Sequence, residues 1–202
     1  MRVMLLGATG LTGGKVLQGL LGRDEVSQVV ALVRHKLPTL HDKLDQHELD
    51  FDKLEGHAEL FDVDVIICCL GTTIKKAGSQ DQFRKVDLGY PLKAGELGRS
   101  QGVRAFILMS AIGASSSSTI FYNRVKGELD DRKEQRTAEA LGIKAMPLVN
   151  RLLIGPLDKY RGIEAQTVAD AMVNEACSLA SEPAAEQVIQ TREYDEIVQL
   201  AG

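Results

Sequence analysis

The sequence predicts a single α/β domain built on a doubly wound parallel sheet. Short apolar runs alternate with longer amphipathic stretches along the 202-residue chain, a pattern typical of parallel sheets with helices on both faces. VDVIICCLG, at 63–71, has the continuous apolar composition of a strand buried on both faces. A glycine-rich segment joins the first apolar run to the first helical pattern. We expect one domain over residues 1–202, with a small substrate-side part from about 150–202.

Each element has its own signal in the chain. The first helix is expected to end at Gly22, a residue type common at helix ends. Pro91 should kink the helix over 79–102, and Pro147 limits how much of the sixth strand can pair centrally. The strands expected from the apolar runs are 3–8, 28–34, a short one within 49–54, 63–71, 104–111, one within 143–155, and 186–191. The expected helices are 11–22, 79–102, 118–142, 163–180 and 192–202.

Composition excludes several classes of function. The net charge is −4, and no basic run is long enough to follow a nucleic-acid backbone. No apolar run reaches membrane-spanning length, and the amino terminus does not resemble a signal peptide. We therefore expect a cytoplasmic protein without nucleic-acid or membrane partners. The three cysteines form no CxxC motif, and the four histidines lack metal-ligand spacing, so no metal site is predicted.

The segment GATGLTGGKV has the pattern of a dinucleotide-binding turn. Gly7 would permit a sharp exit from the strand, and Gly10 would let a pyrophosphate approach the backbone. Gly13 would let the helix lie close to the sheet. The helix amino terminus would then present free N–H groups to the phosphates. A purely structural turn is the alternative.

Arg34 stands at the end of the second strand, where NAD-binding sites usually carry an acidic residue for the ribose 2′-hydroxyl. A guanidinium there would instead bind a 2′-phosphate. The sequence therefore predicts NADP(H) rather than NAD(H). The alternative is a solvated basic turn formed by Arg34, His35 and Lys36.

Tyr122 and Lys126 are four residues apart in FYNRVKGELD and would share one helix face. Ser110 ends the fifth strand, at the sheet edge where ligands usually bind. A phenol can protonate a carbonyl oxygen as hydride arrives, a nearby ammonium favours the resulting phenolate, and a serine hydroxyl can hold the oxygen. Ser110, Tyr122 and Lys126 are therefore candidate catalytic residues. An ordinary helix surface is the alternative for the tyrosine–lysine pair.

Six ordered segments carry a resemblance: GATGLTGG, DFDKLE, CCLGTTIKKAGS, FRKVDLGYPLKAGEL, SAIGASS and FYNRVKGELD. Together they resemble the atypical short-chain dehydrogenase/reductase family, within the group of the Tat-interacting oxidoreductase and NmrA-like proteins. The resemblance implies a Rossmann-type fold, a Ser–Tyr–Lys catalytic set in which Lys126 also reaches the nicotinamide ribose, and Arg34 on the 2′-phosphate. Relatives in this group often pair, which makes a homodimer one expectation, but the sequence leaves the oligomeric state open. Residues that would contact the pyrophosphate are Gly7, Thr9, Gly10, Leu11 and Thr12, and those lining the cofactor after the fourth strand are Cys69, Leu70 and Gly71.

Two departures from that family bear on function. Relatives usually place Arg-Pro and a small residue after the sixth strand, whereas this chain has Asn150 and Arg151. Relatives also carry a helical segment that covers the substrate, whereas Pro156 runs almost directly into LDKYRG. The leading prediction is an NADP(H)-dependent oxidoreductase acting on an unidentified small carbonyl or alcohol. The alternative is a non-catalytic NAD(P)H sensor, since one fold supports many functions.

Overall fold

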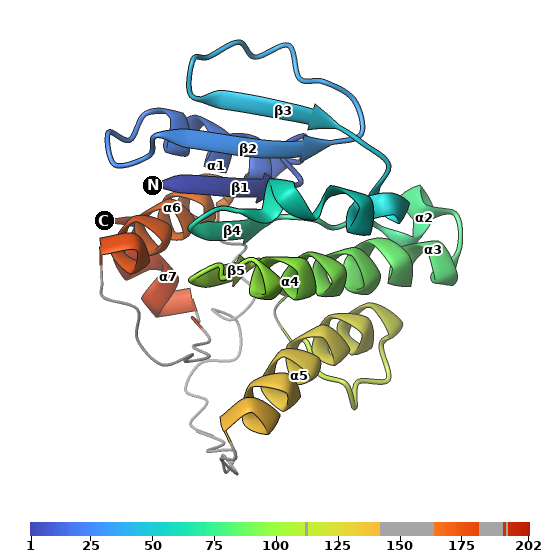
Figure 1. Cartoon of the computed structure of the whole chain (residues 1–202). Helices are drawn as coiled ribbons and strands as arrows, with labels where there is room; N and C mark the ends of the chain where they lie inside the picture. The colour runs from blue at the N-terminus through green and yellow to red at the C-terminus, as the bar shows by residue number, and fades with distance from the viewer. Residues whose placement is uncertain (112, 142–163, 182–191, 193) are drawn as a thin grey trace.

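A parallel sheet of five strands forms the centre of the computed structural model, which describes residues 1–111, 113–141, 164–181, 192 and 194–202. The strand order is β3-β2-β1-β4-β5, and every pair is parallel (Figure 1). The doubly wound α/β fold predicted from the sequence is confirmed. The strands are β1 (Arg2–Leu6), β2 (Gln28–Val33), β3 (Leu44–Glu48), β4 (Val65–Cys68) and β5 (Ala105–Leu108).

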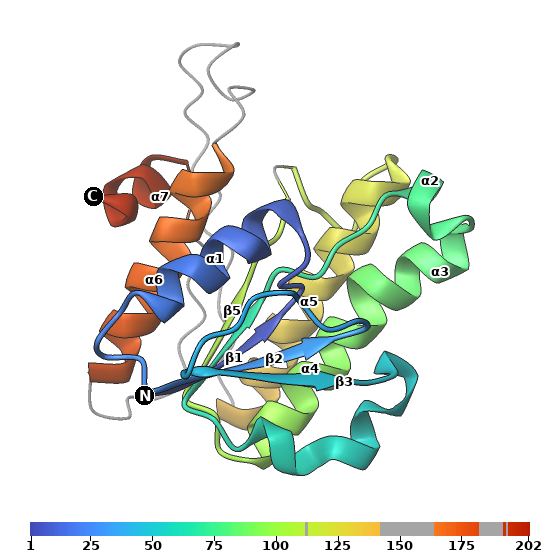
Figure 2. The same cartoon turned by 90° about the horizontal axis from the view of Figure 1, so that it is seen from above.

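Helices cover both faces of this sheet. In Figure 2, α1 and α6 lie on one side of the strands, and η1 and α4 lie on the other. The helix α5 packs against η2 at the end of the sheet beyond β5. The helical elements are α1 (Leu11–Leu21), the 3₁₀ helix η1 (Phe51–Phe61), α2 (Ile74–Ala77), α3 (Gln80–Arg84), the π-helical turn η2 (Lys85–Gly89), α4 (Tyr90–Ser100), α5 (Phe121–Leu141), α6 (Ala165–Ser181) and α7 (Tyr194–Ala201).

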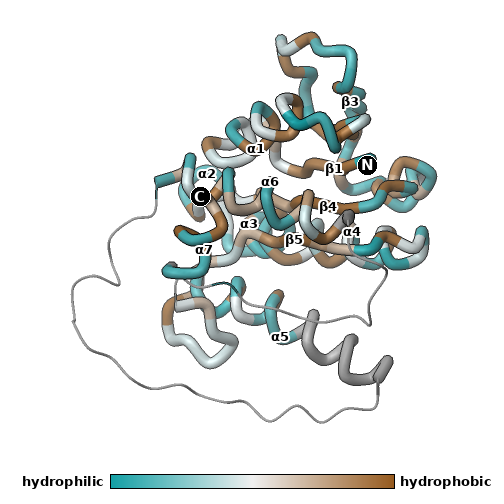
Figure 3. Tube along the Cα trace, turned by 90° about the vertical axis from the view of Figure 1, so that its left-hand side faces the viewer, coloured by the Kyte–Doolittle hydropathy of each residue, from teal (hydrophilic) through white to brown (hydrophobic). Residues whose placement is uncertain are grey.

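The central strand β1 has apolar side chains on both faces of the sheet. Val3 and Leu5 enter the core beneath α1 and α6, whereas Met4 and Leu6 enter the core beneath η1 and α4. Consecutive side chains of a strand point to opposite faces, so a strand covered on both sides must be apolar throughout. This explains the continuous apolar runs in the sequence, and the tube in Figure 3 is predominantly hydrophobic along β1 and β4.

The helix α6 packs on α1 through small and branched side chains. Ala169, Val173 and Ala176, which the sequence places on one face, are all buried. A Cβ atom on Gly19 of α1 would lie 3.1 Å from Cγ2 of Val173. The lack of a side chain on Gly19 therefore lets the two helices approach closely.

Two predicted elements were misplaced. The short strand expected within 49–54 is wrong, because 51–61 forms η1 and the edge strand β3 lies earlier, at Leu44–Glu48. The predicted helix over 79–102 is interrupted before Pro91, not at it, by the π turn η2. Pro91 has no N–H to donate to the carbonyl of Asp87, and a widened turn accommodates that missing bond. The strands expected within 143–155 and at 186–191 lie outside the described residues.

The topology fixes where a ligand can bind. The strand β1 lies between β2 and β4, so the chain connections run away from it in both directions. In doubly wound sheets the loops after such a strand separate and leave a crevice at the carboxyl edge. The segment after β1 is the glycine-rich turn.

Candidate functional site

The glycine turn has the geometry that a phosphate-binding turn needs. Gly7 has φ +86°, a left-handed conformation that favours glycine, and its carbonyl accepts the amide of Gly10 at 3.0 Å. A Cβ on Gly13 would lie only 2.1 Å from the Gly7 carbonyl oxygen, so α1 packs directly on the turn. Within the part of the chain that the structure describes, no side chain caps the start of α1 at Gly10. The first amides of α1 are therefore free of the side-chain acceptor that usually satisfies such groups.

A cleft of about 300 Å³ opens between this turn and the start of α5. It brings together several predicted residues that are far apart in the chain, from Gly10 to Lys126. The lining residues are Gly10, Leu11, Thr12, Gly13, Cys69, Gly71, Thr72, Thr73, Lys76, Met109, Ser110, Tyr122 and Lys126. Sequence reasoning missed Thr72, Thr73, Lys76 and Met109.

Four predicted cofactor residues lie outside this lining. Gly7 and Thr9 belong to the turn behind it, and Leu70 packs against the core under η1 and α4. Arg34 is exposed immediately after β2, at the same carboxyl edge of the sheet.

Cys69 forms part of the cleft wall and is buried. Burial raises the pKa of its thiol to about 12, with a smaller contribution from the neighbouring Cys68. Its Sγ lies 3.9 Å from Sδ of Met172 on α6. Because the thiolate is the reactive form of cysteine, Cys69 serves here as an apolar wall and not as a nucleophile.

Lys126 is buried beneath the cleft and paired with Asp87 of η2. Its Nζ lies 2.8 Å from Asp87 Oδ1, and both side chains are almost completely inaccessible to solvent. The other carboxylate oxygen, Oδ2, accepts the backbone amide of Thr72 at 2.9 Å. Asp87 therefore links the loop after β4 to the helix that carries Lys126. Sequence reasoning missed Asp87, a single acidic residue between the apolar Val86 and Leu88.

Tyr122 and Ser110 have different surroundings. The Tyr122 ring lies 5.6 Å from the ring of Phe83 in a tilted arrangement, and about a third of the residue is exposed to solvent. The Ser110 hydroxyl donates to Asp130 Oδ2 at 2.8 Å. Both residues line the cleft together with Lys126.

Packing against α3 and η2 fixes the orientation of α5. Phe83 and Leu88 form a buried cluster with Val125 and Leu129 of α5. Arg84 makes two contacts with the Glu128 carboxylate, at 3.2 and 2.5 Å. One face of α5 is therefore held against η2, and Lys126 reaches Asp87 from that helix.

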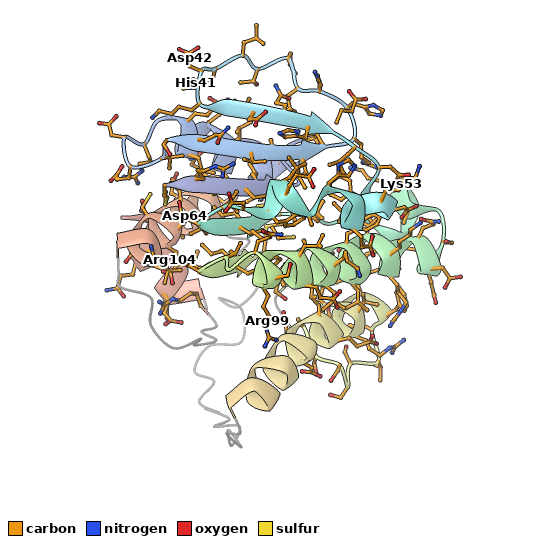
Figure 4. All side chains as sticks on the ribbon, viewed as in Figure 1. His41, Asp42, Lys53, Asp64, Arg99 and Arg104 are labelled. Carbon is orange, nitrogen blue, oxygen red and sulfur yellow. The ribbon has the colours of Figure 1, made fainter. Side chains whose placement is uncertain are left out.

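A second hollow, of about 370 Å³, lies at the opposite, amino edge of the sheet, around Asp64 and Arg104 (Figure 4). Three of its lining residues, Arg2, Asp62 and Asp64, contact one another. Arg2 contacts the side chain and carbonyl of Asp62, and the Arg2 amide donates to the Asp64 carboxylate. None of the predicted cofactor or catalytic residues lines this hollow, whereas the carboxyl-edge cleft is lined by Ser110, Tyr122, Lys126 and the start of α1, so that cleft is the candidate site.

Comparison with known proteins identifies the family. A family model described as NAD(P)H-binding matches residues 7–145, which include the glycine turn, the cleft-lining residues and the whole of α5. The chain belongs to this NAD(P)H-binding family. The predicted family resemblance and the Rossmann-type fold are thus confirmed. Membership supports dinucleotide binding without distinguishing NADP(H) from NAD(H).

Relatives agree with that membership. The chain is 39% identical over 145 residues to protein HTATIP2 of Rattus norvegicus, covering 70% of this chain and 60% of that protein. It is 37% identical over 133 residues to the mitochondrial protein FMP52 of Meyerozyma guilliermondii, covering 65% of this chain and 57% of that protein. The chain therefore spans somewhat less than two thirds of either relative.

Solved structures show the same fold at low sequence identity. A UDP-glucose 4-epimerase from Thermotoga maritima superposes with a TM-score of 0.58 at 17% identity, covering 71% of this chain and 53% of that one. Likeness at this level of identity concerns the architecture alone.

The expected cytoplasmic location is corrected by the fungal relatives of this chain. Several of them are named as mitochondrial proteins. The lack of a recognisable amino-terminal signal was therefore not a sufficient reason to place the chain in the cytoplasm. Within the described part of the chain, no helix combines the length and apolar character needed to span a membrane.

Proposed function

We propose that this protein is an NADP(H)-dependent oxidoreductase that transfers hydride to or from a small carbonyl or alcohol substrate. The observation that carries the proposal is one cleft lined both by the uncapped start of α1 and by Ser110, Tyr122 and Lys126. The first group suits a dinucleotide, and the second suits proton transfer to a carbonyl oxygen.

The residues of the turn fit a bound dinucleotide. The pyrophosphate would lie against the amides that follow Gly10, in space that a side chain at that position would restrict. Gly7, Thr9, Leu11, Thr12 and Gly13 would complete this cradle. Cys69 and Gly71 would border the cofactor where it passes the end of β4, with Leu70 supporting them from the core.

When bound, the nicotinamide would supply or accept the hydride. The Tyr122 hydroxyl would give its proton to the carbonyl oxygen, and the Lys126 ammonium would favour the phenolate left behind. The Ser110 hydroxyl would turn from Asp130 to hold that oxygen during the step. Tyr122 lines the cleft and is partly exposed to solvent, so a substrate could reach it.

Preference for NADP(H) is proposed from Arg34. Its guanidinium is exposed directly after β2, and no acidic residue stands in that position to repel a 2′-phosphate. A planar set of donors matches phosphate oxygens in pairs.

Binding and turnover together test the proposal. Isothermal titration calorimetry should show tighter binding of NADPH than of NADH, and the protein should oxidise NADPH with some member of a broad carbonyl panel. Tyr122→Phe should abolish that oxidation and leave the NADPH dissociation constant within about twofold. Absence of heat with both nucleotides would rule the proposal out.

A non-catalytic NAD(P)H sensor is the second candidate. The hydrogen bond from Ser110 to Asp130 favours it, because that hydroxyl is already donated within the protein. The departures at Asn150, Arg151 and Pro156 also favoured a sensor, but they lie outside the described residues. NADPH binding without any consumption across the carbonyl panel would select the sensor.

A further inference from the structure

The ion pair between Asp87 and Lys126 has an unusual setting for two charged side chains. Asp87 is fully buried and Lys126 is 3% exposed, yet Lys126 also forms part of the cleft lining. Burying a charge is costly unless it is paired and hydrogen-bonded. A buried pair of this kind often stabilises a fold no better than apolar side chains of the same size. Stability alone is therefore a poor explanation for placing a charge pair under the cleft.

The backbone conformation at Asp87 allows its carboxylate to contact two groups at once. The π turn η2 brings its carboxylate beneath the cleft, where Oδ1 meets Lys126 Nζ at 2.8 Å and Oδ2 accepts the Thr72 amide at 2.9 Å. A Cβ atom on Gly71 would lie 3.5 Å from that Oδ1 and 3.9 Å from Nζ, so this glycine sits directly beside the pair. One carboxylate thus fixes both the ammonium on α5 and the loop that follows β4.

We propose that Asp87 is a positioning residue for cofactor binding and that it acts through Lys126. The inference rests on the proposed function, in which Lys126 reaches the nicotinamide ribose. A lysine has a long, flexible side chain, and holding its ammonium in one place reduces the entropy lost when it binds a ligand. Asp87 holds Nζ from below while the Thr72 amide holds Asp87.

A double-mutant cycle on NADPH affinity tests this role. The four proteins are the unmodified chain, Asp87→Asn, Lys126→Gln and the double variant, with dissociation constants from titration calorimetry and melting temperatures as the check on folding. Asp52→Asn is the matched control, because Asp52 pairs with Lys85 of the same π turn at 2.6 Å but lies outside the cleft. Asp87→Asn and Lys126→Gln should each weaken NADPH binding about five- to tenfold, and Asp52→Asn should weaken it less than about twofold.

The decisive comparison is between Lys126→Gln and the double variant. If Asp87 acts through Lys126, removing Asp87 as well should leave the dissociation constant within about twofold of that of Lys126→Gln. The double variant also replaces a charged pair by a neutral one of similar shape, so it should fold even where Asp87→Asn alone does not. The inference would be overturned if the increase in the NADPH dissociation constant of the double variant equalled the product of the two single increases. It would also be overturned if Asp87→Asn changed that dissociation constant by less than about twofold. If the unmodified chain did not bind NADPH, that result would instead contradict the proposed function.

Discussion

Gly7 and Cys69 lie in backbone contact where β1 and β4 end side by side. A Cβ atom on Gly7 would stand 2.6 Å from the Cys69 carbonyl oxygen, closer than real Cβ atoms approach other atoms. Gly7 also has φ +86°, so two independent constraints require glycine there. The glycine expected only for a sharp turn therefore also lets the ends of two central strands close on each other.

Gly7→Ala should destabilise the fold by about 2–4 kcal/mol, since it combines a strained φ with a clash against rigid backbone. Urea unfolding followed by circular dichroism measures this change. Gly56→Ala is the control, because no atom of the described residues lies within 4 Å of its added Cβ. That variant should change the free energy of unfolding by less than about 1 kcal/mol. Equal effects of the two substitutions would contradict the role assigned to the Gly7–Cys69 contact.

Gly127→Ala should detach the loop after β5 from α5. An added Cβ would lie 2.1 Å from the carbonyl carbon of Ser115, and the Ser115 amide is bonded to the Asn123 carbonyl at 3.0 Å on the same helix. The loop must move, and we expect a loss of about 1–3 kcal/mol from overpacking. Hydrogen exchange followed by mass spectrometry should show faster exchange in the peptide covering 113–118. Unchanged exchange there would show that the loop accommodates the methyl group without leaving the helix.

Much of the fold was predictable because hydrophobic periodicity reports burial. The runs at 3–8, 28–34 and 63–71 are mostly apolar, since β1, β2 and β4, which lie within them, are covered on both faces. The edge strand β3 escaped notice because LDQHE is mostly polar, and an edge strand needs only one paired side and little burial. Backbone pairing with β2 forms it, and that pairing leaves no signal in its own composition.

The candidate site was predictable where a residue type at a given spacing has one strong chemical explanation. The glycine turn and the spacing of Tyr122 and Lys126 are of this kind, and the cleft brings them together. Asp87 could not be foreseen, because its position depends on the π turn before Pro91 and on a partner 39 residues away in the chain, Lys126. Long-range pairing of single polar residues has no periodicity for a sequence to show.

Stability should fall at alkaline pH through Tyr90. Burial, and then its hydrogen bond to the Asp52 carboxylate, raises the pKa of the phenol to about 12 from 10.0. The folded protein holds this proton more tightly than the unfolded chain, so the stability gained is complete below pH 10 and is lost as pH rises toward 12.

Urea unfolding of the unmodified protein and Tyr90→Phe at pH 8 and pH 11 measures this contribution. The unmodified protein should lose about 1 kcal/mol more than the variant, less than the full linkage because the phenol is partly solvated. The pKa of Cys69 is also raised, so ionisation of its thiol lowers the free energy of unfolding between pH 9 and 12. This loss occurs in both proteins and therefore cancels in the comparison. Parallel losses in the two proteins would exclude Tyr90 as the source.

Arg34 should decide between the two dinucleotides. The residue is exposed at the end of β2, and its charge reaches Tyr90 across the carboxyl edge, where it opposes the raised pKa of that phenol. Charge-assisted pairing with a 2′-phosphate is worth about 1.5–3 kcal/mol, so Arg34→Gln should weaken NADPH binding about 10- to 100-fold. NADH has no 2′-phosphate, so its dissociation constant should change by less than about twofold. Lys36→Gln is the matched control, because it removes one positive charge from the same exposed turn two residues further on. Calorimetric titration of the three proteins with both nucleotides separates a specific phosphate contact from a generally basic turn. If the turn contributes only its general positive charge, the two substitutions should weaken NADPH binding equally.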